Sequence, residues 1–126
     1  MTSILIVDDS DIWRRLTKDI LRKNPYRLFE ADSGEQALRV ARENPVNLVV
    51  MDYRMHHLDG MDTSRQLREI PGYEQVPVIL ITSENFPGDC KETPAPHVDG
   101  YVDKKHLIRE LDDCVKHHLK LDARVA

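Results

Sequence analysis

The chain contains three short apolar runs that no polar residue interrupts, at positions 4–7, 48–51 and 78–81. A strand that is covered on both faces of a parallel sheet has this pattern, because neither face meets water. Two weaker strand candidates lie at positions 27–31 and 100–102. The pattern therefore predicts five strands.

Apolar residues at helical spacing fill the intervals between these strands. Ser10 can cap a first helix, and Ser33 opens a capping-box sequence for a second. A third helix is predicted at about 61–70, ended by Pro71 and Gly72, and a last helix follows the fifth strand. The apolar residues at this spacing are Ile12, Leu16 and Ile20 in the first helix, Ala37, Leu38 and Ala41 in the second, and Leu107, Ile108, Leu111, Cys114, Val115 and Leu119 in the last.

Residues 84–99, between the fourth and fifth strands, break this alternation because they carry no apolar stripe. The residues there that disfavour a helix are Pro87, Gly88, Pro94 and Pro96. Proline inside a helix costs about 3 kcal/mol, so we expect at most one or two turns, near residues 89–93. The order of the other elements predicts an α/β fold: a single domain, residues 1–126, with helices on both faces of a doubly wound parallel sheet.

Composition narrows the possible functions. With 126 residues, 40% of them hydrophobic, and a net charge of −4, the chain resembles an ordinary globular domain. The acidic balance gives no reason to expect nucleic acid or an anionic membrane as a partner. No apolar run approaches the roughly 20 residues of a membrane-spanning helix, and the first residues lack the features of a signal peptide. The two cysteines, Cys90 and Cys114, are expected to be reduced thiols in a cytoplasmic protein.

Polar residues follow the carboxyl ends of the predicted strands. They are Asp8 and Asp9 after the first strand, Asp52 after the third, Thr82 after the fourth and Lys104 shortly after the fifth. Ligands bind at this edge of an open parallel sheet, so we expect these side chains to converge. Each residue alone has a plain structural explanation, since aspartates form turns and caps and lysines are commonly solvated. The joint pattern favours a functional site.

The charges of these residues indicate the chemistry. Carboxylates that converge repel one another unless a cation neutralises them. Clustered aspartate oxygens suit Mg²⁺, and Lys104 supplies a second positive charge. Such a site is suited to phosphoryl transfer, where positioning and charge neutralisation provide most of the catalysis. An aspartate can itself accept the phosphoryl group.

Five motifs together resemble the receiver domain of two-component response regulators over essentially the whole chain. They are residues 4–10 (ILIVDDS), 49–55 (VVMDYRM), 58–60 (LDG), 77–83 (PVILITS) and 100–104 (GYVDK). The resemblance implies the flavodoxin-like receiver fold, a five-stranded parallel sheet in the order 2-1-3-4-5 with five helices. The proline-bearing segment predicts that the fourth helix is short or missing.

The resemblance also implies a role for each polar residue. Asp52 would be the phosphoacceptor, and Thr82 and Lys104 would contact the phosphoryl oxygens. Mg²⁺ would be the cofactor, with ligands from Asp8, Asp9, Asp52 and the backbone carbonyl of Arg54. Tyr101 would be the aromatic residue that turns inward when Thr82 moves.

The sequence departs from the family pattern in several places. His56 and Lys105 stand where the family usually has proline, which bears on loop geometry. Arg54 and Glu84, two residues after the acceptor and the threonine, are predicted to pair across the mouth of the site, restrict water access and slow loss of the phosphoryl group. The unusual segment 84–99 puts the family's common dimer interface in question, and we expect a monomer or a weak homodimer.

The leading hypothesis is a stand-alone phosphorylation-dependent signalling module, similar to chemotaxis receivers, without an output domain of its own. It would receive phosphate from a histidine kinase or histidine phosphotransfer protein and switch a surface that binds an unknown downstream protein. It would be no enzyme beyond catalysing its own phosphorylation and dephosphorylation. A second hypothesis is a phosphorylation-independent interaction domain that retains the receiver fold. A third, a metal-dependent phosphatase, finds no second acid–base residue beside Asp52. Trp13, the single tryptophan, is expected near the site mouth or on the flank of its helix.

Overall fold

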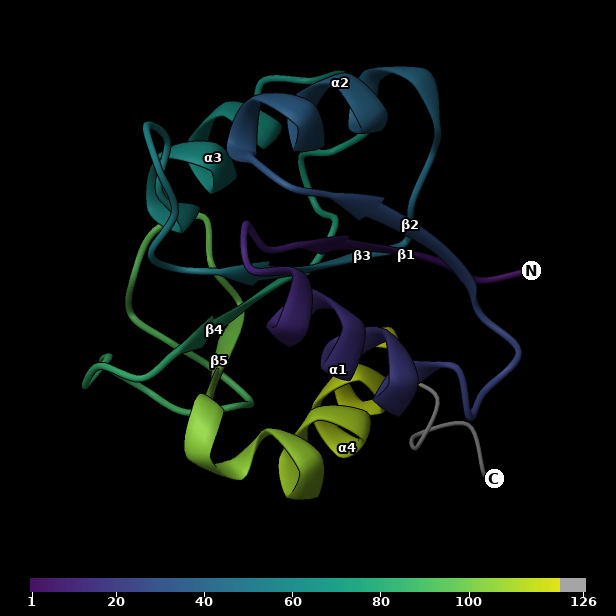
Figure 1. The fold of residues 1–126 in the computed structure, drawn as a ribbon. Helices are drawn as coiled ribbons and strands as arrows, with labels where there is room; N and C mark the ends of the chain where they lie inside the picture. Colours follow the sequence, from purple (N-terminus) through teal and green to yellow (C-terminus); the bar gives the residue numbers. More distant parts are fainter. Residues whose placement is uncertain (121–126) are drawn as a thin grey trace.

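One parallel sheet of five strands, in the order β2-β1-β3-β4-β5, forms the centre of the protein in a computed structural model that describes residues 1–120 (Figure 1). The strands are β1 (Ser3–Val7), β2 (Arg27–Ala31), β3 (Leu48–Asp52), β4 (Val78–Thr82) and β5 (Gly100–Asp103). The order and the parallel pairing confirm the predicted doubly wound fold. The predicted domain runs to residue 126, and residues 121–126 lie outside the described part.

Two pairs of helices cover the opposite faces of the sheet (Figure 1). The helices are α2 (Gly34–Glu43) and α3 (Gly60–Leu67) on one face, and α1 (Asp11–Leu21) and α4 (Leu107–Leu119) on the other. On β1, Leu5 and Val7 belong to the core under α2 and α3. Ile4 and Ile6 belong to the core under α1 and α4, because successive strand side chains point to opposite faces. All residues of β1, β3 and β4 are buried, which explains their unbroken apolar runs.

The predicted caps are present at the start of the first two helices. Oγ of Ser10 accepts a hydrogen bond from the N–H of Trp13 at 3.3 Å. Oγ of Ser33 accepts one from the N–H of Gln36 at 3.0 Å. These oxygens satisfy N–H groups that have no partner inside their helix. Within residues 1–120, no helix has the length and apolar character that crossing a membrane requires.

Three details of the helix predictions are wrong. Helix α3 ends at Leu67 rather than at residue 70, because the N–H of Ile70 bonds to the carbonyl of Leu67, a three-residue step that closes a turn. Ile12 is 80% exposed, although it was grouped with the buried Ile20. Each four-residue step turns about 40° beyond a full helical turn, so a stripe at this spacing drifts off the buried face. Ile108, which was predicted to belong to the apolar stripe of the last helix, lies beside that stripe and is 71% exposed.

No helix forms between β4 and β5, a stretch that lies wholly within the described residues, so the fourth helix implied by the resemblance is missing, as predicted. Short turns hold the segment instead. The N–H of Asp89 bonds to the carbonyl of Glu92 at 2.8 Å, and Oδ1 of Asp89 accepts from the N–H of Lys91 at 2.8 Å. The carbonyl of Asp89 accepts from the N–H of Tyr101 at 3.0 Å, which ties this turn to β5. Residues 89–93 form no turn of helix, which lies within the limit of at most one or two turns that the sequence predicted.

Arg68, just after α3, anchors the far end of the same segment. Its guanidinium donates to the carbonyls of Tyr73 and His97, each at 3.0 Å, and to the carbonyl of Val76. It also bonds to Oδ2 of Asp99 at 3.0 Å. The same carboxylate accepts from the first N–H of β4 at 2.8 Å. Side-chain contacts thus replace the missing helix in holding the segment against the sheet.

Candidate acidic site at the carboxyl edge of the sheet

The sheet brings the predicted acidic residues together. β1 and β3 are neighbours, so Asp8 and Asp9, which follow β1, meet Asp52 at the end of β3. Carboxylate oxygens of the three residues all lie within 4.8 Å of one another. Asp8 and Asp52 are buried, while Asp9 is partly exposed. This arrangement confirms that the strand ends converge, as expected for a doubly wound sheet.

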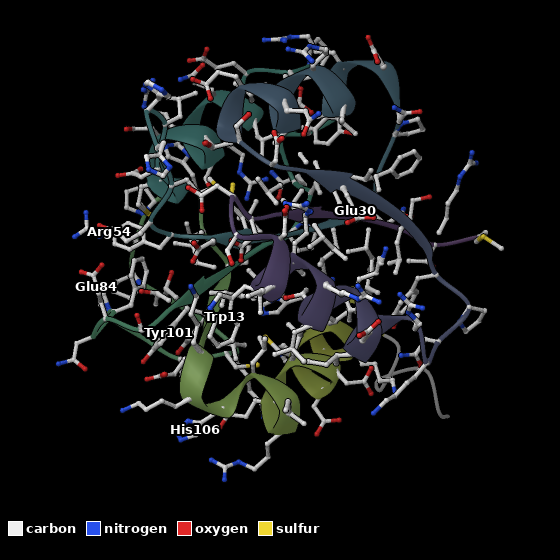
Figure 2. All side chains as sticks on the ribbon, viewed as in Figure 1. Trp13, Glu30, Arg54, Glu84, Tyr101 and His106 are labelled. Carbon is white, nitrogen blue, oxygen red and sulfur yellow. The ribbon has the colours of Figure 1, made fainter. Side chains whose placement is uncertain are left out.

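Lys104 is the cation that the protein itself supplies. It begins a short 3₁₀ turn, Lys104–His106, directly after β5. Its Nζ lies 3.3 Å from Oδ1 of Asp52, and its side chain is 18% exposed. On its other side, Nζ lies 4.8 Å from the centre of the Trp13 ring. Trp13, a residue of α1, is therefore at the site, and its ring lies next to the start of the last helical segment (Figure 2).

The negative charge of the three carboxylates exceeds the positive charge of Lys104. Burial raises the pKa of Asp8 to about 6, assisted by the negative charge of Asp52, although a hydrogen bond from the N–H of Ser10 opposes this rise. Burial also raises the pKa of Asp52, and the neighbouring Lys104 opposes that change. One lysine thus faces three aspartates. A divalent cation with oxygen ligands fits this cluster by charge and by donor type.

Thr82 ends β4, the strand beside β3, and is buried. The register pairs Asp52 with Ile81, which places Thr82 one residue farther toward the carboxyl edge. Its Oγ1 accepts a hydrogen bond from the N–H of Glu84 at 3.0 Å. The hydroxyl proton of Thr82 is therefore free to be donated to an anion at this edge.

Arg54 and Glu84 lie in contact, as the sequence predicted, and Figure 2 shows them side by side at the outer edge of the molecule. Nη2 of Arg54 donates to Oε1 of Glu84 at 3.0 Å, and Nε donates to Oε2. The pairing lowers the pKa of Glu84 and raises the pKa of Arg54. The guanidinium also lies 5.0 Å from the centre of the Tyr53 ring. The side chains are 67% and 43% exposed, so this is a surface ion pair.

Contacts made by two further residues at the site, His56 and Phe86, were not predicted from the sequence. Nδ1 of His56 lies 2.8 Å from Oδ2 of Asp9, so this residue touches the acidic cluster itself, beyond the loop geometry considered for it. The ring of Phe86 lies 5.6 Å from that of Tyr101 and 5.7 Å from that of Tyr53. The sequence feature that could have indicated these ring contacts is Phe86 itself, the lone aromatic residue of a segment otherwise rich in proline and polar residues. Tyr101, at one end of this row of rings, is half-buried.

The fold and the site together define a class: a doubly wound α/β domain with clustered carboxylates and a lysine at the carboxyl edge of its sheet. The family model for the response regulator receiver domain matches residues 4–116. The chain therefore belongs to the response regulator receiver domain family, as its motifs indicated. Membership implies signalling in a two-component phosphorelay.

Curated relatives support this membership. The chain is 34% identical to the two-component response regulator ORR7 of Oryza sativa subsp. japonica over 85 residues, which cover 67% of this chain and 40% of the relative. It is 32% identical to the transcriptional regulatory protein SrrA of Staphylococcus aureus (strain NCTC 8325 / PS 47) over 108 residues, which cover 86% of this chain and 44% of the relative. The matched part of the chain thus covers less than half the length of these relatives.

Solved structures have the same fold. Vibrio cholerae chemotaxis protein CheY4 is 24% identical, with a TM-score of 0.83 over 93% of this chain and 98% of that one. The receiver domain of the sensor histidine kinase PA1611 from Pseudomonas aeruginosa PAO1 is 26% identical, with a TM-score of 0.83 over 94% of this chain and 98% of that one. A magnesium ion is coordinated in the active site cleft of the PA1611 domain.

Proposed function

We propose that the chain is a phosphorylation-dependent signalling module in which Asp52 accepts a phosphoryl group. One observation carries this proposal: the buried carboxylate of Asp52 lies 3.3 Å from the ammonium of Lys104 and shares an acidic cluster with Asp8 and Asp9. A carboxylate held beside a cation is placed to act as a nucleophile while the charge of the incoming group is neutralised.

In the proposed reaction an oxygen of Asp52 attacks the phosphorus atom of a phosphohistidine or of acetyl phosphate. A new O–P bond forms, and the bond from phosphorus to the leaving group breaks with its electron pair on that group. Lys104 pairs with one phosphoryl oxygen, and the free hydroxyl proton of Thr82 is donated to another. Attack by water later releases inorganic phosphate and restores the Asp52 carboxylate.

The cofactor in this proposal is Mg²⁺, held by Asp8, Asp9, Asp52 and the backbone carbonyl of Arg54. The three clustered carboxylates support it, because a single lysine cannot balance their negative charge. The pKa of Asp8, raised mainly by burial and further by the charge of Asp52, shows that its ionised form lacks compensation in the protein alone. The magnesium ion in the PA1611 receiver domain is consistent with the same assignment. When bound, such an ion neutralises charge on the phosphoryl oxygens.

The proposed phosphoryl donor is a histidine kinase or a histidine phosphotransfer protein, and the output is a contact with a downstream protein rather than turnover of a free substrate. A monomer or weak homodimer remains our prediction, since the segment between β4 and β5 is irregular in this chain. We also propose a cytoplasmic location, which the free thiols of Cys90 and Cys114 support.

Arg54 and Glu84 are proposed to lengthen the life of the phosphoryl group. They follow β3 and β4 at the edge where Asp52 lies, and two hydrogen bonds join them across the two loops. The Tyr53 ring beneath the guanidinium supports Arg54 in this position. A pair bridging these loops hinders the approach of water to the acceptor.

The test is incubation with Mg²⁺ and acetyl phosphate, followed by intact-mass spectrometry. Wild-type protein is expected to gain the mass of one phosphoryl group, and Asp52→Asn is expected to gain none. Asp32→Asn is the matched control, because Asp32 is an exposed aspartate that follows the neighbouring strand β2. A wild-type protein without the mass gain, or a phosphorylated Asp52→Asn, would overturn the assignment.

A second candidate function is a phosphorylation-independent interaction domain. The absence of a helix between β4 and β5, observed within the described residues, favours it, because this part of the receiver surface is altered here. The complete set of Asp8, Asp9, Asp52, Thr82 and Lys104 opposes it. Titration with Mg²⁺ and then with a fluoroberyllate phosphoryl mimic separates the two, since an interaction domain of this kind is expected to bind neither.

A further inference from the structure

The ammonium of Lys104 is held between two groups, and only one of them belongs to the acidic cluster. Oδ1 of Asp52 lies 3.3 Å from Nζ, and the centre of the Trp13 ring lies 4.8 Å from it. An ammonium within about 6 Å of a ring centre is attracted by the negative face of the ring, and tryptophan gives the strongest attraction. The ring and the carboxylate together define where the ammonium lies.

Both partners of this contact are fixed by their backbones. Trp13 lies in the first turn of α1, where its N–H bonds to Oγ of the cap residue Ser10 at 3.3 Å, and its ring packs on the core beneath α1 and α4. Lys104 opens the short 3₁₀ turn, whose cap Asp103 accepts from the N–H of Lys105 at 2.9 Å. The contact therefore joins two elements that are each held in place independently of it.

A lysine at this position needs such support. Its stem has many rotamers, and its ammonium is strongly attracted to water. The indole face removes part of this freedom and keeps water from one flank of the ammonium, which strengthens its attraction to Asp52. A lysine held in advance loses less freedom when a phosphoryl oxygen arrives.

We propose that Trp13 is a positioning residue that holds the Lys104 ammonium where it meets the phosphoryl group on Asp52. This inference rests on the proposed function, since it names a residue that supports the same transfer. Phosphorylation adds negative charge on the phosphoryl oxygens beside the held ammonium. Trp13, the single tryptophan, is expected to report this change of charge because its ring contacts the ammonium.

The first measurement tests the contact without any phosphorylation. In the NMR spectrum of the wild-type protein, the ring current of Trp13 is expected to shift the ε-methylene protons of Lys104 upfield. Trp13→Phe should retain part of this shift and Trp13→Leu should lose it. Lys104→Met, which leaves the ring untouched, should change the intensity or wavelength of the tryptophan emission. An unshifted Lys104 together with unchanged emission would overturn the proposed contact.

The second measurement tests the consequence for transfer. With acetyl phosphate and saturating Mg²⁺, Trp13→Leu is expected to be phosphorylated about three- to thirtyfold more slowly than wild type, the range that corresponds to one cation–π contact. Trp13→Phe should be less impaired. In a Lys104→Met background, Trp13→Leu should cause little further loss, whereas a purely structural tryptophan would cause the same loss in both backgrounds.

These outcomes separate the two levels of inference. If wild-type protein does not accept a phosphoryl group, the proposed function fails, and the NMR and emission results still decide whether the contact exists. If wild type is phosphorylated and Trp13→Leu is equally fast, the positioning role is wrong and the proposed function stands. Trp13→Phe and the emission of Lys104→Met keep the test decisive if Trp13→Leu folds poorly.

Discussion

Replacement of Asp8 by asparagine is expected to stabilise the metal-free protein while impairing its response to Mg²⁺. Burial is the main reason why the pKa of Asp8 rises from 3.8 to about 6, and the charge of Asp52 adds to it. A tenfold change in acidity corresponds to about 1.4 kcal/mol, so ionised Asp8 costs the folded state about 3 kcal/mol at neutral pH. Asparagine removes this cost and keeps a side-chain oxygen for the 2.9 Å hydrogen bond from the N–H of Ser10.

The sign of the pH dependence follows from the same values. Between about pH 4 and pH 6 the folded protein holds a proton on Asp8 that the unfolded chain has released. The proton held by the folded state stabilises it relative to the unfolded chain. This stabilisation is complete below pH 3.8 and is lost as pH rises through about 6. The advantage of Asp8→Asn over wild type should accordingly be small near pH 4 and reach about 3 kcal/mol above pH 7.

Urea unfolding in EDTA, at pH values from 4 to 8, measures this difference. Adding Mg²⁺ at neutral pH should stabilise wild type, by binding only the folded state, and should stabilise Asp8→Asn much less. Asp32→Asn, which changes an exposed carboxylate, serves as the control and should show neither effect. An Asp8→Asn variant that is no more stable than wild type in EDTA at pH 7.5 would refute the reasoning.

Two further predictions concern the segments around the site. Arg54→Ala is expected to shorten the half-life of the aspartyl phosphate by up to about fivefold, with a smaller difference at high salt, because the pair with Glu84 is exposed; a half-life that is unchanged or longer contradicts the proposal. Arg68→Ala is expected to lower the free energy of unfolding in urea by about 2–4 kcal/mol, because it leaves carbonyls without their donor and removes the charged partner of the Asp99 carboxylate. Arg65→Ala, at an exposed position of α3, should change it by less than about 0.5 kcal/mol, and equal losses would refute the role of Arg68.

The sequence predicted the features that depend on neighbours along the chain. The unbroken apolar runs gave β1, β3 and β4, and the caps at Ser10 and Ser33 gave the starts of two helices. The acidic site could also be predicted, because strand ends in a parallel sheet share one edge and Asp8 and Asp52 each come directly after an apolar run. These patterns arise from the alternation of side chains along a strand, the periodicity of the helix, and the unpaired N–H groups at a helix start. Each of these effects acts over only a few neighbouring residues.

Only the tertiary structure decided which side chains meet across long separations in the chain. Three such contacts have no periodic pattern in the sequence that could predict them. They are the ion pair of Arg68 with Asp99, the contact of the Phe86 and Tyr101 rings, and the Trp13 ring beside the Lys104 ammonium. Such contacts depend on the angles and distances at which packed elements meet, and residues scattered along the chain fix these jointly. The sequence therefore determined where the proposed phosphoacceptor Asp52 lies, and the tertiary packing of α1 decided which side chain lies beside Lys104.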